Sequence, residues 1–120
     1  MFLFDSSAII ELHKGNDESL LEKYGNVSLA TISLTYGEVY LYYLRKALNK
    51  NKLRESLEIV EFTVEDMEEA MELLYVHKKK TKDFSFVGAV VYTVAKRNNL
   101  TLVTKDLGFK GLPNVEMITV

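Results

Sequence analysis

The sequence contains no cysteine, and among its 120 residues there are only two histidines, His13 and His77. The absence of cysteine excludes disulfides, thiolate zinc sites and cysteine nucleophiles. Because two imidazoles are the only nitrogen ligands of the kind that metals favour, any metal site in this chain must be built mainly from oxygen.

Long apolar runs, linkers and repeats are also missing. The apolar segment Ala89–Tyr92 is far shorter than the roughly 20 residues of a membrane span, and the first residues show no signal core behind a basic stretch. The one proline is Pro113, and no glycine-rich or serine-rich tract interrupts the chain. With 48% hydrophobic content, the chain can form one core but not two. We expect residues 1–120 to form a single domain in the cytoplasm.

Charge is unevenly distributed, although the formal net charge is only −2. Residues 78–110 contain eight basic side chains and two acidic ones. Such a basic segment is typical either of a solvated helix end or of a surface that follows an RNA backbone. The candidate RNA-binding residues are Lys78, Lys79, Lys80, Lys82, Lys105 and Lys110.

Short apolar runs alternate with helical patterns along the chain. Strands are predicted at Phe2–Phe4, Val27–Ala30, Ile59–Phe62, Leu100–Val103 and Val115–Ile118. This alternation is typical of a parallel sheet with helices on both faces. We therefore expect an α/β protein with three α/β/α layers and a short parallel sheet of four to five strands.

Two helices are predicted in the first half of the chain. Ser7–Leu12 is the first, with a serine near its start. Thr35 and Glu38 have the T-x-x-E spacing of a capping box, which predicts that a second helix opens at Thr35. Glu38 would then lie in the first turn, and the inward positions would be Val39, Tyr43 and Leu44.

Two further helices are predicted in the second half. Thr63 and Asp66 resemble a capping box with aspartate in the usual place of glutamate, before an amphipathic helix that ends near Lys78. Ser85 is expected to cap the next helix, which is apolar on more than one side and ends before Asn98.

Three acids are placed to meet at one edge of this sheet. Asp5 and Asp106 follow the first and fourth predicted strands, and Glu38 opens the helix after the second. Ligands of such sheets bind at the carboxyl ends of the strands. Clustered carboxylates repel one another unless a cation is present, and Mg²⁺ or Mn²⁺ bound there can activate water for phosphodiester hydrolysis.

Each acid also has a purely structural interpretation. Asp5 fits a turn or helix cap, Glu38 half of a capping box, and Asp106 a loop residue bonded to the backbone. The shared position of the three acids after strands favours the functional interpretation.

Several segments, in this order and at this spacing, resemble the PIN-domain family, especially the small VapC-like toxins of prokaryotic toxin–antitoxin pairs. They are Phe2–Ser7, Ser33–Glu38, Ser85–Tyr92, Leu102–Asp106 and Phe109–Val115, so that the resemblance covers essentially the whole chain. It implies a Mg²⁺-dependent or Mn²⁺-dependent endoribonuclease with a PIN-like fold.

The resemblance also implies residue roles and partners. Asp5, Glu38 and Asp106 match the family's metal-binding and catalytic acids, with Thr104 and Ser7 as polar support. The implied partners are RNA, an antitoxin protein that would cover the site, and a second copy of the chain. The stretch Tyr36–Leu44 has more apolar surface than one helix face can bury, which fits either a dimer interface or a two-sided core helix.

One acid of the family pattern S-[FY]-x-D-A is missing, because Gly88 stands at the aspartate position. The change removes a metal ligand and a partner in the cap that Ser85 forms. Three explanations remain open: a weakened site that still binds metal, a domain that binds without cleaving, and a change introduced to silence the enzyme. Asp83 is a poor substitute, because five helical residues correspond to a rotation of about 140°.

Two other functions are compared with the ribonuclease. A catalytically inactive PIN module that holds RNA or a partner protein is the main alternative. A receiver-like or phosphatase-like domain with Asp5 as phosphoryl acceptor is disfavoured, because no second acid follows two positions after Asp5.

Overall fold

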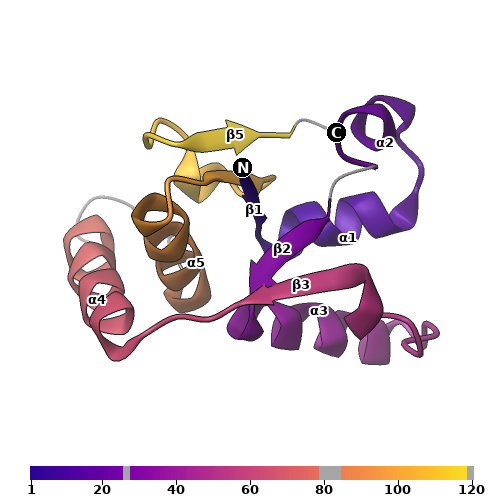
Figure 1. Ribbon diagram of the computed structural model, residues 1–120, viewed down its shortest axis with the longest axis horizontal. Coiled ribbons are helices and arrows are strands. Elements are labelled where there is room, and N and C mark those ends of the chain that lie inside the picture. Colours follow the sequence, from indigo (N-terminus) through magenta and orange to yellow (C-terminus); the bar gives the residue numbers. More distant parts are fainter. Residues whose placement is uncertain (26–27, 79–84, 119–120) are drawn as a thin grey trace.

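The computed structural model describes residues 1–25, 28–78 and 85–118 of the chain (Figure 1). The elements, in order, are β1 (Phe2–Phe4), α1 (Ser6–Lys14), α2 (Glu18–Tyr24), β2 (Leu29–Ile32), α3 (Ser33–Arg45), η1 (Arg54–Ser56), β3 (Leu57–Val60), α4 (Val64–Lys78), α5 (Phe86–Arg97), β4 (Thr101–Thr104), η2 (Leu107–Phe109) and β5 (Val115–Met117). In the part of the chain that the structure describes, none of the helices has the length and apolarity needed to cross a membrane.

All strand pairings are parallel, which confirms the predicted α/β class. β1, β4 and β5 form one hydrogen-bonded sheet in the order β1-β4-β5, and β2 pairs with β3. β2 lies beside β1, where the Thr31 hydroxyl donates to the Phe4 carbonyl oxygen at 2.6 Å. A side-chain hydrogen bond therefore links the two groups of strands at this boundary.

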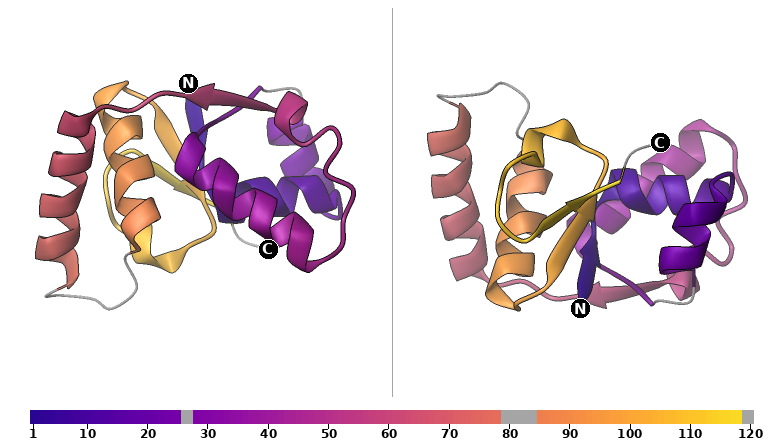
Figure 2. Two further views of the ribbon diagram at one scale, coloured as in Figure 1. Left: turned by 90° about the horizontal axis from the view of Figure 1, so that it is seen from below. Right: turned by 90° about the horizontal axis from the view of Figure 1, so that it is seen from above.

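Successive residues of β1 and β4 point to opposite faces of the sheet, and helices cover both faces. Leu3 and Leu102 belong to the core on the side of α4 and α5, whereas Phe4 and Val103 belong to the core on the side of α1, α2 and α3. All four side chains are fully buried. Both views in Figure 2 show α5 between α4 and the strands, so that α4 forms the outer edge of the molecule.

The predicted helix starts in the second half of the chain are confirmed. At α4, the Thr63 amide donates to Asp66 Oδ2 at 2.9 Å and the Asp66 amide donates to Thr63 Oγ1 at 3.1 Å, which is a reciprocal capping box. At α5, Ser85 Oγ accepts from the Gly88 amide at 2.9 Å. The α5 helix is buried from Gly88 to Ala95, as expected for a helix between two layers.

The predicted start of α3 is wrong. The helix begins at Ser33, directly after β2, and its N-cap residue Ile32 makes no side-chain cap hydrogen bond. Thr35 therefore lies inside the helix, fully buried, and Glu38 lies in the second turn. Because β2 leads straight into α3, Thr35 falls within the helix and cannot be its N-cap residue. Leu44, predicted inward, is 52% exposed.

Helix α2 was not predicted. The sequence feature that marks its start is the N-cap residue Asp17. The Asp17 carboxylate accepts from the Ser19 amide at 3.0 Å and from the Leu20 amide at 3.2 Å. Leu20 and Tyr24 are the buried positions of this short helix, and they complete the core next to α1.

Candidate active site

A pocket of about 150 Å³ lies where β1 and β4 end and where α1, α3 and α5 begin. All three predicted acids, Asp5, Glu38 and Asp106, line it. The remaining lining side chains are hydroxyls and apolar groups, from Ser6, Ser7, Thr35, Ser85, Val87, Val91 and Phe109, with Gly88 between them. The structure thus brings together three carboxylates that are far apart in the sequence.

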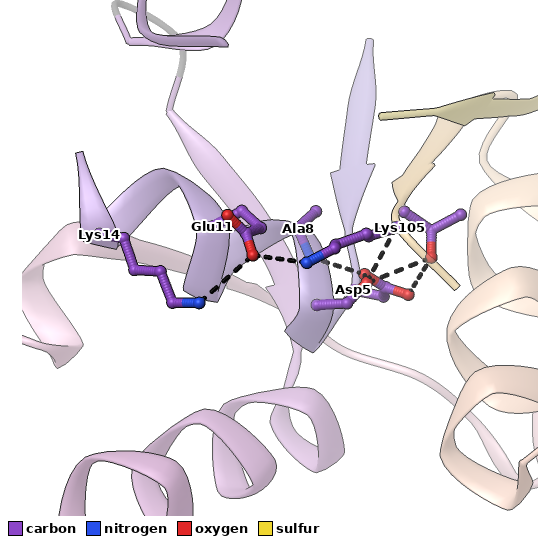
Figure 3. A network of polar contacts seen from close by, with 7 residues as sticks. Asp5, Ala8, Glu11, Lys14 and Lys105 are labelled. Atoms are coloured by element: carbon purple, nitrogen blue, oxygen red, sulfur yellow. Dashed lines mark hydrogen bonds and ion pairs between the residues drawn. The ribbon is translucent and has the colours of Figure 1, made fainter. Parts of the chain in front are cut away.

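Asp5 is the deepest of the three acids and is 7% exposed. Its Oδ1 accepts from the Ala8 amide at 3.0 Å (Figure 3) and from Ser7 Oγ at 2.7 Å. Its Oδ2 accepts from the Thr104 hydroxyl. Burial raises the pKa of Asp5, although these hydrogen bonds oppose the shift, and the charge of Asp106 raises the pKa further. Asp5 is therefore the N-cap of α1. It is also a buried carboxylate whose ionised form is unfavourable, and a nearby cation would stabilise that form.

Thr104 and Ser7 tie the start of α1 to the end of β4. The Thr104 side chain is fully buried, and its Oγ1 accepts from the Asp106 amide at 3.0 Å while its hydroxyl is bonded to Asp5. Ser7 Oγ accepts from the Lys105 amide at 3.0 Å. These bonds determine the position of Asp106 relative to Asp5.

Asp106 combines a structural contact with its place in the pocket. Its Oδ1 accepts from the Gly108 amide at 2.9 Å, so that it caps the η2 turn. This is the backbone-bonded role that the sequence also allowed.

Glu38 lies at the rim of the pocket. The residue as a whole is exposed, while the pocket wall partly covers its carboxyl group. This desolvation raises the pKa of Glu38, an interaction with Ser6 opposes the shift, and the charge of Asp5 adds to it. The carboxyl groups of Glu38 and Asp5 are thus close enough to interact electrostatically.

The chemistry of the pocket fits a hard divalent cation. Its lining side chains in the described part of the chain offer oxygen donors and include no lysine or arginine that would neutralise the three acids. Thr35 Oγ1 is buried there without a hydrogen-bond partner among the described residues. Over those same residues, no three histidine or acidic side chains are gathered closely enough to form a complete ligand set.

Gly88 lies in the first turn of α5 and lines the same pocket as these acids. A Cβ added at Gly88 would stand 2.9 Å from Phe109 Cζ and 2.8 Å from Ser85 Oγ, both closer than real Cβ contacts allow. The buried ring of Phe109 thus occupies the space that a side chain at this position would need. Neither Phe109 nor Thr35 was predicted as a site residue, although Thr35 was predicted as the cap of α3 and both residues lie in segments that resemble the family.

The basic residues are only partly described. Lys105 Nζ is 2.7 Å from Glu11 Oε1, and Lys14 Nζ lies 3.4 Å from the same oxygen (Figure 3). The hydrogen bond from Lys105 is the main reason why the pKa of Glu11 is lowered. Lys110 is exposed. Lys79, Lys80, Lys82 and Asp83 lie outside the described residues, and for Lys78 only the helical backbone is described.

The comparison with protein families identifies the family of this chain. A model of the PIN domain family matches residues 2–114, and the chain therefore belongs to the PIN domain family. None of the curated proteins compared with the chain matched it.

Solved structures show the same fold at low sequence identity. A toxin–antitoxin complex from Klebsiella pneumoniae is 18% identical, with a TM-score of 0.78 over 98% of this chain and 97% of that one. VapBC2 from Rickettsia felis, bound to a DNA fragment from its promoter, is 20% identical, with a TM-score of 0.74 over 98% of both chains. The sarcin-ricin loop cleaving toxin VapC20 from Mycobacterium tuberculosis is 18% identical, with a TM-score of 0.68 over 93% of this chain and 92% of that one.

Proposed function

We propose that this chain acts as a single PIN domain that cleaves RNA in a metal-dependent reaction, in the manner of a VapC-like toxin. The observation that carries the proposal is the convergence of Asp5, Glu38 and Asp106 on one pocket whose described lining supplies oxygen donors and no basic side chain. Similarity in fold to VapC20, a toxin that cleaves the sarcin-ricin loop, supports RNA as the substrate class.

In this proposal Asp5, Glu38 and Asp106 hold Mg²⁺ or Mn²⁺. When bound, such a cation activates a water molecule and stabilises charge on a phosphoryl oxygen. Thr104 and Ser7 keep the Asp5 carboxylate in place through the hydrogen bonds described above. Burial and the neighbouring acids make the ionised carboxylates unfavourable without a cation, which supplies the driving force for metal binding.

Gly88 weakens this activity in the proposal. The family's fourth carboxylate is absent, and Phe109 fills part of the space where it would stand. The cation would thus have fewer protein ligands, which lowers its affinity and leaves more of its coordination to water.

The proposed partners follow from the same assignment. Lys105 and Lys110, with Lys78, Lys79, Lys80 and Lys82, would contact the RNA backbone, and their contribution would decrease with salt. Because the Klebsiella and Rickettsia neighbours are toxin–antitoxin assemblies, we propose an antitoxin as the protein partner. A homodimer is proposed through α3, where Leu41 and Leu44 are 44% and 52% exposed. The proposed location is the cytoplasm.

RNA cleavage with and without divalent cation tests the proposal. The wild-type chain should cleave RNA slowly with Mn²⁺ or Mg²⁺ and not at all with a chelator. Asp5→Asn should abolish the cleavage, and Gly88→Asp combined with Phe109→Leu should increase it. Cleavage that survives Asp5→Asn would show that it comes from a contaminating nuclease and would remove the support for this function.

The packing of Phe109 against Gly88 favours one alternative, a PIN module that binds RNA or a partner protein without cleaving. A pocket wall without space for a side chain at position 88 suits a domain that does not need a full ligand set. RNA binding that is unaffected by chelator and by Asp5→Asn, together with no cleavage by the Gly88→Asp, Phe109→Leu variant, would support this alternative.

A further inference from the structure

The hydroxyl of Thr35 is a buried polar group without a hydrogen bond. Thr35 is 0% exposed, and within residues 1–25, 28–78 and 85–118 its Oγ1 has no partner. A threonine inside a helix ordinarily bonds to the carbonyl oxygen one turn earlier, and Thr35 does not use that option. Buried polar groups are rarely left unsatisfied, because the desolvation of the group is then not compensated. The Thr35 hydroxyl is therefore available to donate a hydrogen bond to an acceptor in the pocket.

Thr35 lies one helical turn before Glu38 on α3, and both residues line the acidic pocket. Residues three apart on a helix are neighbours on its surface. Helical side chains lean toward the N-terminus, so that the Glu38 side chain extends over the turn that contains Thr35. The carboxylate of Glu38 is thus the nearest charged acceptor along the helix for the unpartnered hydroxyl.

The two residues differ in depth. Thr35 lies in the first turn of α3 and is fully buried. Glu38 is an exposed residue at the rim, and the pocket wall covers only part of its side chain. A cation between Asp5 and Asp106 would attract the Glu38 carboxylate inward, toward Thr35. A hydrogen bond from a hydroxyl to a carboxylate is stronger than one between neutral groups, and it would hold the carboxylate in that inward position.

We infer that Thr35 is a positioning residue for Glu38: its hydroxyl donates to the Glu38 carboxylate when a divalent cation occupies the pocket. The inference rests on the proposed function, since it assumes that the pocket binds a cation. Thr35 does not touch the reacting atoms and acts only through Glu38. Without the cation, the desolvation of the Thr35 hydroxyl is not compensated by a hydrogen bond, but the donor is already in position.

Mn²⁺ titration of the intact chain, followed by the electron paramagnetic resonance signal of the free ion, tests the inference. Thr35→Val removes the hydroxyl and keeps the volume, and it should weaken Mn²⁺ binding about tenfold, as expected for the loss of one hydrogen bond to a charged group. Thr35→Ser keeps the hydroxyl and should bind nearly as the wild type. Thr93→Val, the same change at a buried position of α5 outside the pocket, is the matched control and should leave Mn²⁺ affinity unchanged.

A second readout separates this role from a structural one. In the presence of chelator, Thr35→Val should melt at the same temperature as the wild type or higher, because the substitution removes an uncompensated polar group. In a Glu38→Ala background, Thr35→Val should cause no further loss of Mn²⁺ affinity, since the hydroxyl then has no carboxylate to hold.

The outcomes are distinguishable. If Mn²⁺ binding depends on Asp5 but is equal in the wild type and Thr35→Val, or if the Thr35 and Glu38 effects add independently, the inference is overturned and the proposed function stands. If the wild-type chain takes up no Mn²⁺ at all, the proposed function and this inference are both overturned. Lower stability of Thr35→Val in chelator would show that the hydroxyl supports the fold instead.

Discussion

The ring of Phe109 packs against the backbone of Gly88, and a Cβ added to that glycine would lie 2.9 Å from Phe109 Cζ. The two residues come from different elements, η2 and α5, and meet in the wall of the acidic pocket. The wall of the pocket thus has no space for a side chain at position 88, and an aspartate introduced there would meet the Phe109 ring.

Gly88→Asp alone should lower the free energy of unfolding by about 1–3 kcal/mol, the usual effect of overpacking. Ser85 can rotate its hydroxyl away, at the loss of its cap bond, but the buried Phe109 ring has no such freedom. Adding Phe109→Leu should recover part of the loss, because the new side chain then has room. Urea unfolding of the two single variants and the double variant measures this coupling, and strictly additive effects would contradict it.

Asp5→Asn should raise the stability at pH 7 while it abolishes cleavage, a common trade-off at functional sites. Burial raises the pKa of Asp5 above 3.8 in the folded chain. Between pH 3.8 and that higher pKa the unfolded chain loses its proton first, so that stability falls as the pH rises through this range. The loss persists at neutral pH. Thermal unfolding at pH 7 checks the direction. Asp17→Ala is the contrasting variant: it should lower the melting temperature by removing the cap of α2 and leave cleavage unchanged.

His13 should make the stability of the fold sensitive to mild acid. Burial lowers the pKa of His13 below 6.5, and its Nδ1 is 2.8 Å from the Tyr43 hydroxyl. The unfolded chain therefore binds a proton at His13 before the folded chain does, and stability falls as the pH decreases from about 6.5 toward the folded pKa. Urea unfolding at pH 7.5 and 5.5 should show a smaller difference for His13→Gln than for the wild type. An equal difference in the two proteins would assign the acid sensitivity to other groups.

The ion pair between Glu11 and Lys105 should limit RNA binding. Lys105 Nζ lies 2.7 Å from Glu11 Oε1, and the Lys105 backbone adjoins the pocket through Ser7. Glu11→Gln should increase RNA affinity by a factor of about two to five, because it frees a cation for the phosphate backbone. Lys105→Ala should weaken binding and reduce the slope of log affinity against log salt by about 1. Fluorescence anisotropy with RNA at several salt concentrations measures both effects, and unchanged affinity in both variants would exclude Lys105 from the RNA-binding surface.

Local spacing in the sequence determined the helix starts in the second half of the chain. The Thr63–Asp66 capping box and the Ser85 cap join residues three positions apart, so that composition and spacing are sufficient to predict them. The strands were also predictable, to within about two residues, because apolar runs between helical patterns report burial on both faces. The placement of Asp5 and Asp106 after strands followed from this order.

Packing decided the parts of the site that spacing misjudged. Thr35 and Glu38 have a capping-box spacing, but α3 starts earlier because β2 runs directly into it, and Thr35 became a buried residue instead of a cap. The contact of Phe109 with Gly88 joins two elements whose distance depends on how α5 and the β4–β5 connection pack. The sequence alone determined the order of the elements and which acids end the strands, because those features depend on local hydrogen bonds and burial. Only the tertiary structure decided how deep each side chain lies and what surrounds it, because contacts between distant segments depend on the packing of the whole core.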